Sequence, residues 1–322
     1  ICFQRTQKMA IEKGWISTPT VLNVPIFMTR DEEESLKSLS KKVGYYMKKF
    51  GDFKLMQMCI SISRARDYAL QRYPGDDPDE KAKEIQVWAI QGDRAVRNRK
   101  EYLYNCKHKI DATVRLLELF KVKSIVFSQS IKFADTIDSL MGDECVVYHS
   151  QIKSGKRQFK KKKSFKTENG AVNYAVKHKH KAPTKIGDEW VVEWYTSKAV
   201  TGNTISKDNI LKYVNGKKRV ISTARGLDKG FDCDTIMMGI DAARTRSSIA
   251  QTQRLGRCVR AYTYKDGTVK RPVFVSLYIP NTTDEDWLRK AQQDMDFQYY
   301  CEDIEEAIGI IKSVLDGQLG KV

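Results

Sequence analysis

The sequence predicts an α/β fold in which helices cover both faces of a parallel β-sheet. Beyond Cys106, five short runs are rich in β-branched and other apolar residues. The segments that separate these runs carry apolar residues at helical spacing. Nearly continuous apolar strands that alternate with helices are typical of a parallel sheet that is buried on both faces.

The first elements of the chain are expected to be a short helix and a strand. Thr6–Lys13 has the pattern of a helix end, and Gly14 follows it as a residue suited to close the last turn. Thr20–Ile26 alternates like a strand. Residues 1–30 therefore form a connection that enters the rest of the fold through a strand.

A long helical stretch comes next, over residues 31–105. The sequence is mostly helical from Asp31 to Gln91, and Thr29 with Glu32 has the pattern of a capping box. The expected breaks in this stretch lie at Gly51, Pro74, Gly75 and Pro78. We interpret it as a helical arm inserted before the main sheet.

The main domain is expected over residues 106–283, and further helices over residues 284–322. The predicted strands are Ser124–Phe127, Cys145–Tyr148, Arg219–Ser222, Thr235–Ile240 and Pro272–Ile279. The predicted helices are Ile110–Phe120, Ile131–Met141, Asp208–Val214, Ile249–Val259, Glu285–Met295 and the amphipathic Ile304–Leu315.

A basic insertion, residues 152–207, interrupts the alternation of strands and helices. Between Lys153 and Lys185 the chain has twelve Lys or Arg residues and one acidic residue, Glu168. We expect the first part, Lys153–Lys166, to be mobile because it carries four consecutive lysines. These are Lys160, Lys161, Lys162 and Lys163.

The second part of the insertion is expected to form a β-hairpin. Val176, His178 and His180 alternate with Lys177, Lys179 and Lys181. A turn near Pro183 and Gly187 then leads to Glu189–Tyr195, where Trp190, Val192 and Trp194 share a face. The lysines are expected to contact phosphates and the two tryptophans to stack on unpaired bases. The alternative is that the tryptophans are buried and only the lysines face solvent.

Charge and composition indicate an intracellular protein with a polyanionic partner. The formal net charge is +17, and 41% of the 322 residues are hydrophobic. No run of eighteen apolar residues is present, so no membrane partner is expected, and the first residues do not resemble a signal peptide. Seven scattered cysteines favour a reducing compartment, cytoplasmic or nucleoid-associated, with no disulfide framework and no metal site.

Two strings in the second half of the chain carry the strongest functional signal. Ile221–Asp232 reads I-S-T-A-R-G-L-D-K-G-F-D, and Gln253–Arg260 reads Q-R-L-G-R-C-V-R. On a helix, Arg257 and Arg260 would point the same way, as a phosphate site requires. The pair resembles motifs V and VI of superfamily 2 helicases, of which the second is Q-x-x-G-R-x-x-R. The alternative is a solvated arginine-rich helix after an ordinary loop.

The resemblance implies a RecA-like lobe that completes an ATP site with another lobe. It implies that Arg257 and Arg260 contact the γ-phosphate as arginine fingers. It also implies that Gly230 lets the backbone approach the nucleotide and that Asp232 bonds the ribose or links the nucleotide to the nucleic-acid site. Gln253 and Gly256 complete the motif. A structural turn with surface salt bridges is the alternative.

The chain shows no phosphate loop and no acidic box, both of which such motors need for ATP and Mg²⁺. Its Gly-Lys pairs, at Gly155 and Gly216, are followed by further basic residues. We therefore expect the C-terminal half of an ATP-dependent helicase or translocase, inactive alone, with Mg²⁺ ligands in the absent N-terminal lobe. The rival hypothesis is a nucleic-acid-binding or adaptor module that keeps the fold without hydrolysing ATP.

Nucleic acid, with DNA favoured over RNA, is expected along the carboxyl ends of the strands. The resemblance implies contacts from residues that follow three strands, and each of these residues is alternatively a helix N-cap. They are Ser128, Gln129, Ser150 and Thr223.

Overall fold

The structure is a computed structural model, and it describes residues 7–227, 233–243, 247–265, 267–293, 295 and 298–316. The chain forms two compact units. The larger unit comprises Ile1–Tyr148 and Lys212–Val322, and the smaller unit comprises His149–Leu211.

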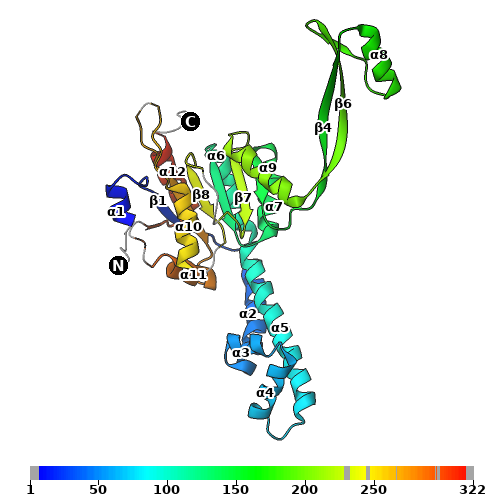
Figure 1. Cartoon of the computed structure of the whole chain (residues 1–322). Coiled ribbons are helices and arrows are strands. Elements are labelled where there is room, and N and C mark those ends of the chain that lie inside the picture. The colour runs from blue at the N-terminus through cyan, green and yellow to red at the C-terminus, as the bar shows by residue number, and fades with distance from the viewer. Residues whose placement is uncertain are drawn as a thin grey trace, which may run out of the picture. The chain divides into compact units, whose positions relative to one another are not determined.

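The larger unit contains a seven-stranded sheet in its described part, with the order β10-β1-β9-β8-β2-β7-β3 (Figure 1). All neighbouring strands pair in parallel. The strands are β1 (Thr20–Pro25), β2 (Ser124–Ser128), β3 (Cys145–Tyr148), β7 (Val220–Ala224), β8 (Met238–Asp241), β9 (Val273–Tyr278) and β10 (Tyr299–Tyr300). Strands β2, β7, β8 and β9 are buried along their whole length. The predicted α/β class with a parallel sheet is thus confirmed.

Helices cover both faces of this sheet. They are α6 (Lys107–Leu119), α7 (Ile131–Met141), α10 (Ser248–Cys258), α11 (Thr283–Ala291) and α12 (Ile304–Leu315). The chain also forms α1 (Gln7–Glu12), a short 3-10 turn at Gly142–Glu144, and α9 (Gly202–Val214), which begins in the smaller unit and ends in the larger one. Ile240 belongs to the main apolar cluster with Leu116 of α6, whereas its neighbour Asp241 bonds Arg254 of α10. Successive strand residues point to opposite faces, so α6 and α10 lie on opposite sides.

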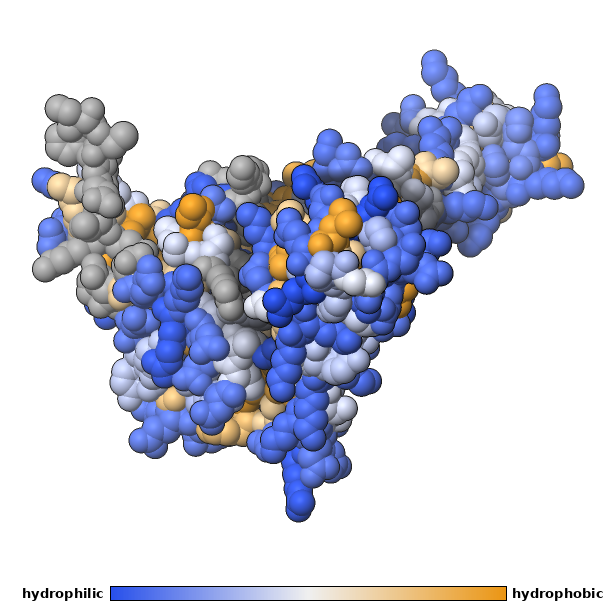
Figure 2. Space-filling view, turned by 90° about the horizontal axis from the view of Figure 1, so that it is seen from below, coloured by the Kyte–Doolittle hydropathy of each residue, from blue (hydrophilic) through white to orange (hydrophobic). Residues whose placement is uncertain are grey.

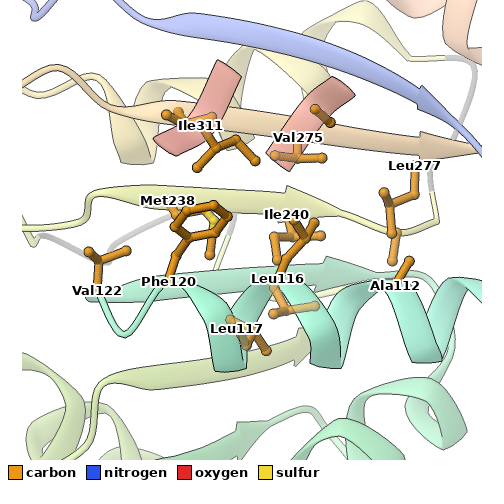
Figure 3. Close-up of a cluster of buried hydrophobic side chains, with 14 of the residues drawn as sticks. Ala112, Leu116, Leu117, Phe120, Val122, Met238, Ile240, Val275, Leu277 and Ile311 are labelled. Carbon is orange, nitrogen blue, oxygen red and sulfur yellow. The ribbon is translucent and has the colours of Figure 1, made fainter. Parts of the chain in front are cut away.

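The main hydrophobic core lies between the sheet and helices α6, α7 and α12. Leu116 of α6 and Phe120, the residue that caps this helix, point toward Met238 and Ile240 of β8 (Figure 3). Ile311 of α12 is part of the same cluster. This core holds the strands in register, and their carboxyl ends consequently meet at one edge.

The arm contains four helices: α2 (Arg30–Phe50), α3 (Phe53–Met58), α4 (Ile62–Arg72) and α5 (Pro78–Tyr104). The predicted capping box is present, since Thr29 Oγ1 accepts from the Glu32 amide and Glu32 accepts from the Thr29 amide at 2.9 Å. Helix α2 ends at Gly51, whose φ of 74° is left-handed. A buried ion pair, Lys109 Nζ to Asp284 Oδ2 at 2.5 Å, joins α6 to α11 where the chain returns to the sheet.

The smaller unit corrects two predictions for the basic insertion. It is a three-stranded antiparallel sheet of β4 (Gly155–Phe165), β6 (Glu189–Val200) and β5 (Thr184–Ile186), with helix α8 (Glu168–Lys177). The prediction that Lys153–Lys166 is mobile is wrong, because β4 pairs with β6 over its whole length. The alternating pattern that ends at His180 is not a strand, because Thr167 caps α8 and Ala171 and Ala175 bury its inner face.

Candidate functional site

Helix α10 carries the residues of the Q-x-x-G-R pattern on one face and its buried residues on the other. The accessible face carries Gln253 and Arg257, both half-buried, and the exposed Gly256. The opposite face is buried and consists of Gln251, Arg254, Leu255 and Cys258. The spacing therefore places the motif side chains on the face of the helix that is turned away from the sheet.

A buried ion pair fixes α10 to β8. Arg254 Nη1 lies 2.8 Å from Asp241 Oδ1 and donates to the Ala243 carbonyl at 3.2 Å. The two side chains are 3% and 0% exposed. Gly239 allows the close packing, since a Cβ there would lie 2.5 Å from Cys258 Sγ. The sequence analysis missed Arg254, although an arginine on the apolar side of a helix after a strand ending in aspartate is a usable signal.

Arg260 does not share a helix with Arg257, so that prediction is wrong. Helix α10 ends at Cys258, and Arg260 forms an isolated antiparallel bridge with Ile16. The Ser17 amide donates to the Val259 carbonyl at 2.7 Å, and Ser17 Oγ donates to the Arg260 carbonyl. These long-range bonds draw the backbone out of the helix, and local spacing gives no sign of them.

The turn after β7 is tied to the turn after β2. The Arg225 amide donates to the Ser128 carbonyl at 3.2 Å, and Arg225 Nε donates to the Gln129 carbonyl at 2.9 Å. Arg225 and Leu227 have φ values of 53° and 62°, which side chains rarely adopt. Gly226 fits against Tyr148, because a Cβ would lie 2.7 Å from its ring. Gly230 and Asp232 lie outside the described residues.

The hydroxyls expected to contact nucleic acid here are buried. Ser128 Oγ donates to the Ser130 carbonyl at 2.8 Å and to the Thr223 carbonyl at 3.3 Å. Thr223 is 1% exposed, and its Oγ1 has no hydrogen-bond partner among the described residues. The N-cap of α7 is Ser130, and not Ser128 or Gln129. Two residues at this edge do reach the surface, the half-buried Gln129 and the exposed Arg225. Gln129 was among the predicted contacts, and Arg225 was not.

In the smaller unit, the expected contacts fall on two faces of one sheet. Ser150 and the lysines at 160–163, 177 and 179 are exposed. In the register of β4 with β6, Lys161 pairs with Trp194 on the side covered by α8. Lys160 pairs with Tyr195 on the opposite side, and Lys162 shares that side with it. The surface of this unit, at the right of Figure 2, is mainly hydrophilic.

The two tryptophans pack into the small core of this unit. Trp190 and Trp194 are half-buried against Ala171 and Ala175 of α8. The His180 ring stacks on Trp194 with centroids 4.6 Å apart and planes 8° apart. This geometry favours the alternative of packed tryptophans. Tyr195, by contrast, is an exposed aromatic residue at 63%. Its position on the strand face opposite the tryptophans could have identified it from the sequence.

Comparison with known proteins gives likenesses of fold alone. No protein family model and no curated protein match the chain. The C-terminal part of the Fun30 ATPase domain is similar with a TM-score of 0.45 and 10% identity, over 94% of this chain and 98% of that one. The Pyrococcus furiosus Hef helicase domain has a TM-score of 0.48 and 12% identity, over 87% and 59%.

DEAD-box proteins are also similar in fold. A C-terminal domain of S. cerevisiae Dbp5 has a TM-score of 0.39 and 16% identity, over 65% of this chain and 92% of that one. This chain spans 42% of a longer Dbp5 chain. The solved structures that resemble the chain thus include a helicase domain and the C-terminal domain of a DEAD-box protein.

No helix in the described part of the chain is both long and apolar enough to cross a membrane.

Proposed function

We propose that this chain is the C-terminal RecA-like lobe of an ATP-dependent superfamily 2 helicase or translocase that acts on nucleic acid. The observation that carries the proposal is the division of α10. Its motif residues Gln253 and Arg257 lie on the accessible face, while Arg254 holds the other face to β8 through Asp241.

The accessible face of α10 fits a phosphate group. A guanidinium keeps its charge and can bind two phosphate oxygens at once, and Arg257 is half-buried on a rigid helix. Bound ATP would supply the free energy of phosphoryl transfer. Arg257 would neutralise charge on the phosphate oxygens, and Arg260 would do so from the segment paired with Ile16. Gly256 leaves room beside Arg257, and Gly230 and Asp232 remain proposed nucleotide contacts.

The Mg²⁺ ligands are proposed to lie in a first lobe, together with the phosphate loop. In the domain arrangement we propose, residues 1–30 connect the two lobes, residues 31–105 form the arm, and residues 106–283 form the second lobe. Residues 284–322 add helices to that lobe.

The turns after β2 and β7 are proposed to bind the nucleic-acid backbone. Arg225 is exposed and held by the Gln129 carbonyl, so its guanidinium is positioned without being neutralised by a carboxylate in that contact. A left-handed non-glycine residue costs about 1–3 kcal/mol, and such strain often marks a functional turn. The buried Thr223 and Ser128 would then stabilise this turn from the interior of the lobe. The lysines of the smaller unit would add phosphate contacts that do not depend on sequence.

The test is a steady-state ATPase assay on a protein that carries this lobe with a first lobe, beside the same assay on this chain alone. We expect nucleic acid to stimulate turnover in the first case and no turnover in the second. Single-stranded DNA, duplex DNA, branched DNA and RNA are compared, because the structure does not favour DNA over RNA. Mg²⁺-dependent turnover by this chain alone would contradict the proposal. Nucleic-acid binding without turnover by the two-lobe protein would favour the adaptor hypothesis.

A further inference from the structure

Three side chains of types that can bind a metal meet at the root of the arm, one from position 32 and two from positions 106 and 108. Glu32 lies in the first turn of α2, Cys106 is the N-cap of α6, and His108 lies in the first turn of α6. One ligand atom from each lies within 4.8 Å of the other two. The arm leaves the sheet through α2 and returns through α5, which brings the ends of the arm together.

The contacts within this cluster leave ligand atoms to spare. His108 Nδ1 is 2.9 Å from Glu32 Oε2, but the contact lacks hydrogen-bond geometry, and this buried nitrogen has no hydrogen-bond partner among the described residues. The capping bonds of Glu32 to Thr29 both use Oε2. Cys106 is 5% exposed at the N-cap of α6, where the backbone amides of His108 and Lys109 face its sulfur. The capping box accounts for the place of Glu32, and it does not account for the thiol and imidazole that converge on the same carboxylate.

We propose that Glu32, Cys106 and His108 bind a zinc ion. A thiolate, an imidazole and a carboxylate form a donor set that suits Zn²⁺, whereas Mg²⁺ and Ca²⁺ take oxygen ligands. Zinc–ligand bonds are about 2.0–2.3 Å long, so small side-chain rotations close the cluster around an ion. With three protein ligands, a fourth position stays open to water.

A cavity gives the ion a path to this position. It has a volume of about 470 Å³, and Glu32 and Cys106 are among its lining residues, with Glu101 beside them. Lys107 and Lys132 also line it, so the site would depend on coordinate bonds more than on attraction by surrounding charge.

The ion would clamp the start of α2 to the start of α6. This role is separate from the ATP and nucleic-acid sites proposed above, because none of the three ligands belongs to them. The expected gain is a stiffer junction between arm and sheet.

The test is a titration of Co²⁺, as a spectroscopic substitute for Zn²⁺, into the reduced and chelator-treated chain. We expect a thiolate-to-cobalt charge-transfer band that saturates at one equivalent and disappears when Zn²⁺ is added. Cys106→Ser should abolish the band, and His108→Gln and Glu32→Gln should weaken binding at least tenfold. Cys59→Ser, which removes a buried thiol outside the cluster, is the matched control and should keep the band.

Thermal melting provides the second readout. Zn²⁺ should raise the Tm of the unsubstituted chain and of Cys59→Ser, and leave the Tm of Cys106→Ser unchanged. Absence of the band in the unsubstituted chain, or an equal band in a folded Cys106→Ser variant, would overturn the proposal. The first of these results does not depend on whether any variant folds.

Discussion

The larger unit contains buried ion pairs between its elements, whereas the lysine side chains of the smaller unit are exposed. Arg254 with Asp241 and Lys109 with Asp284 are almost fully enclosed ion pairs. Lys160, at 53% side-chain exposure, pairs with Glu193 at the surface. A buried charge is retained only with a partner in good geometry, and a surface pair contributes little to folding. The buried pairs of the larger unit can therefore hold a helix in one position. The exposed lysines of the smaller unit can change rotamer to contact a ligand.

The largest expected effect is on chemistry at the accessible face of α10. Arg257→Ala in the two-lobe protein should lower kcat by roughly three orders of magnitude or more, because one charge on the phosphates is lost. Arg257→Lys should recover little, since an ammonium lacks the planar fork. The measurement is an ATPase titration beside a thermal melt. Near-normal kcat, or a loss fully explained by unfolding, would remove Arg257 from the ATP site.

A large effect on stability is expected three residues earlier. Arg254→Ala removes one partner of a buried ion pair, which should lower the free energy of unfolding by about 3–5 kcal/mol. The measurement is urea denaturation followed by circular dichroism. Arg289→Ala is the control, because its pair with Glu285 is a surface i,i+4 contact worth less than about 1 kcal/mol. An equal decrease in the free energy of unfolding for both variants would show that the buried pair contributes no more than the surface pair.

The smaller unit should respond through salt dependence. Lys160→Ala with Lys162→Ala should reduce the slope of log K against log salt on duplex DNA by up to about 0.9 per lysine. Lys161→Ala with Lys163→Ala is the matched pair from the other face, and Lys163 Nζ lies 4.4 Å from the Tyr174 ring centroid. We expect a smaller change for that pair. An unchanged slope for both pairs would show that these lysines do not contact phosphates.

The sequence was a good guide wherever local pattern and core burial agree. Ile131–Met141 and Ile304–Leu315 were predicted with the bounds they have, because their apolar spacing matches a face that is buried. Arg260 was misplaced because bonds to Ile16 and Ser17, far away in the sequence, end the helix. The basic insertion was misread because the lysines of β4 suggested mobility, although a long partner strand supplies its backbone bonds.

The candidate site was predictable in part for the same reason. The motif at Gln253 and Arg257 could be read directly, but the burial of Thr223 depends on strands that pair around it. The proposed zinc ligands could not be predicted from the sequence, since Glu32 and Cys106 come close together only after the whole arm has folded. Local spacing reports one helix face or one strand face, and it does not report which distant segment covers that face.

The smallest expected effect distinguishes the two faces of the β4–β6 sheet. Tyr195→Ala should weaken binding to single-stranded nucleic acid by about 1–3 kcal/mol, roughly 5- to 150-fold, because an exposed ring can stack on a base. Tyr195→Phe keeps the ring and should bind nearly as the unsubstituted chain does. Trp194→Ala should act instead on folding of the smaller unit, because its ring is stacked on His180 and packed against α8. Fluorescence anisotropy with a single-stranded oligonucleotide, beside a thermal melt of each variant, separates the two effects. If Tyr195→Ala binds normally while a folded Trp194→Ala does not, the tryptophan face is the binding face and the assignment of faces is reversed.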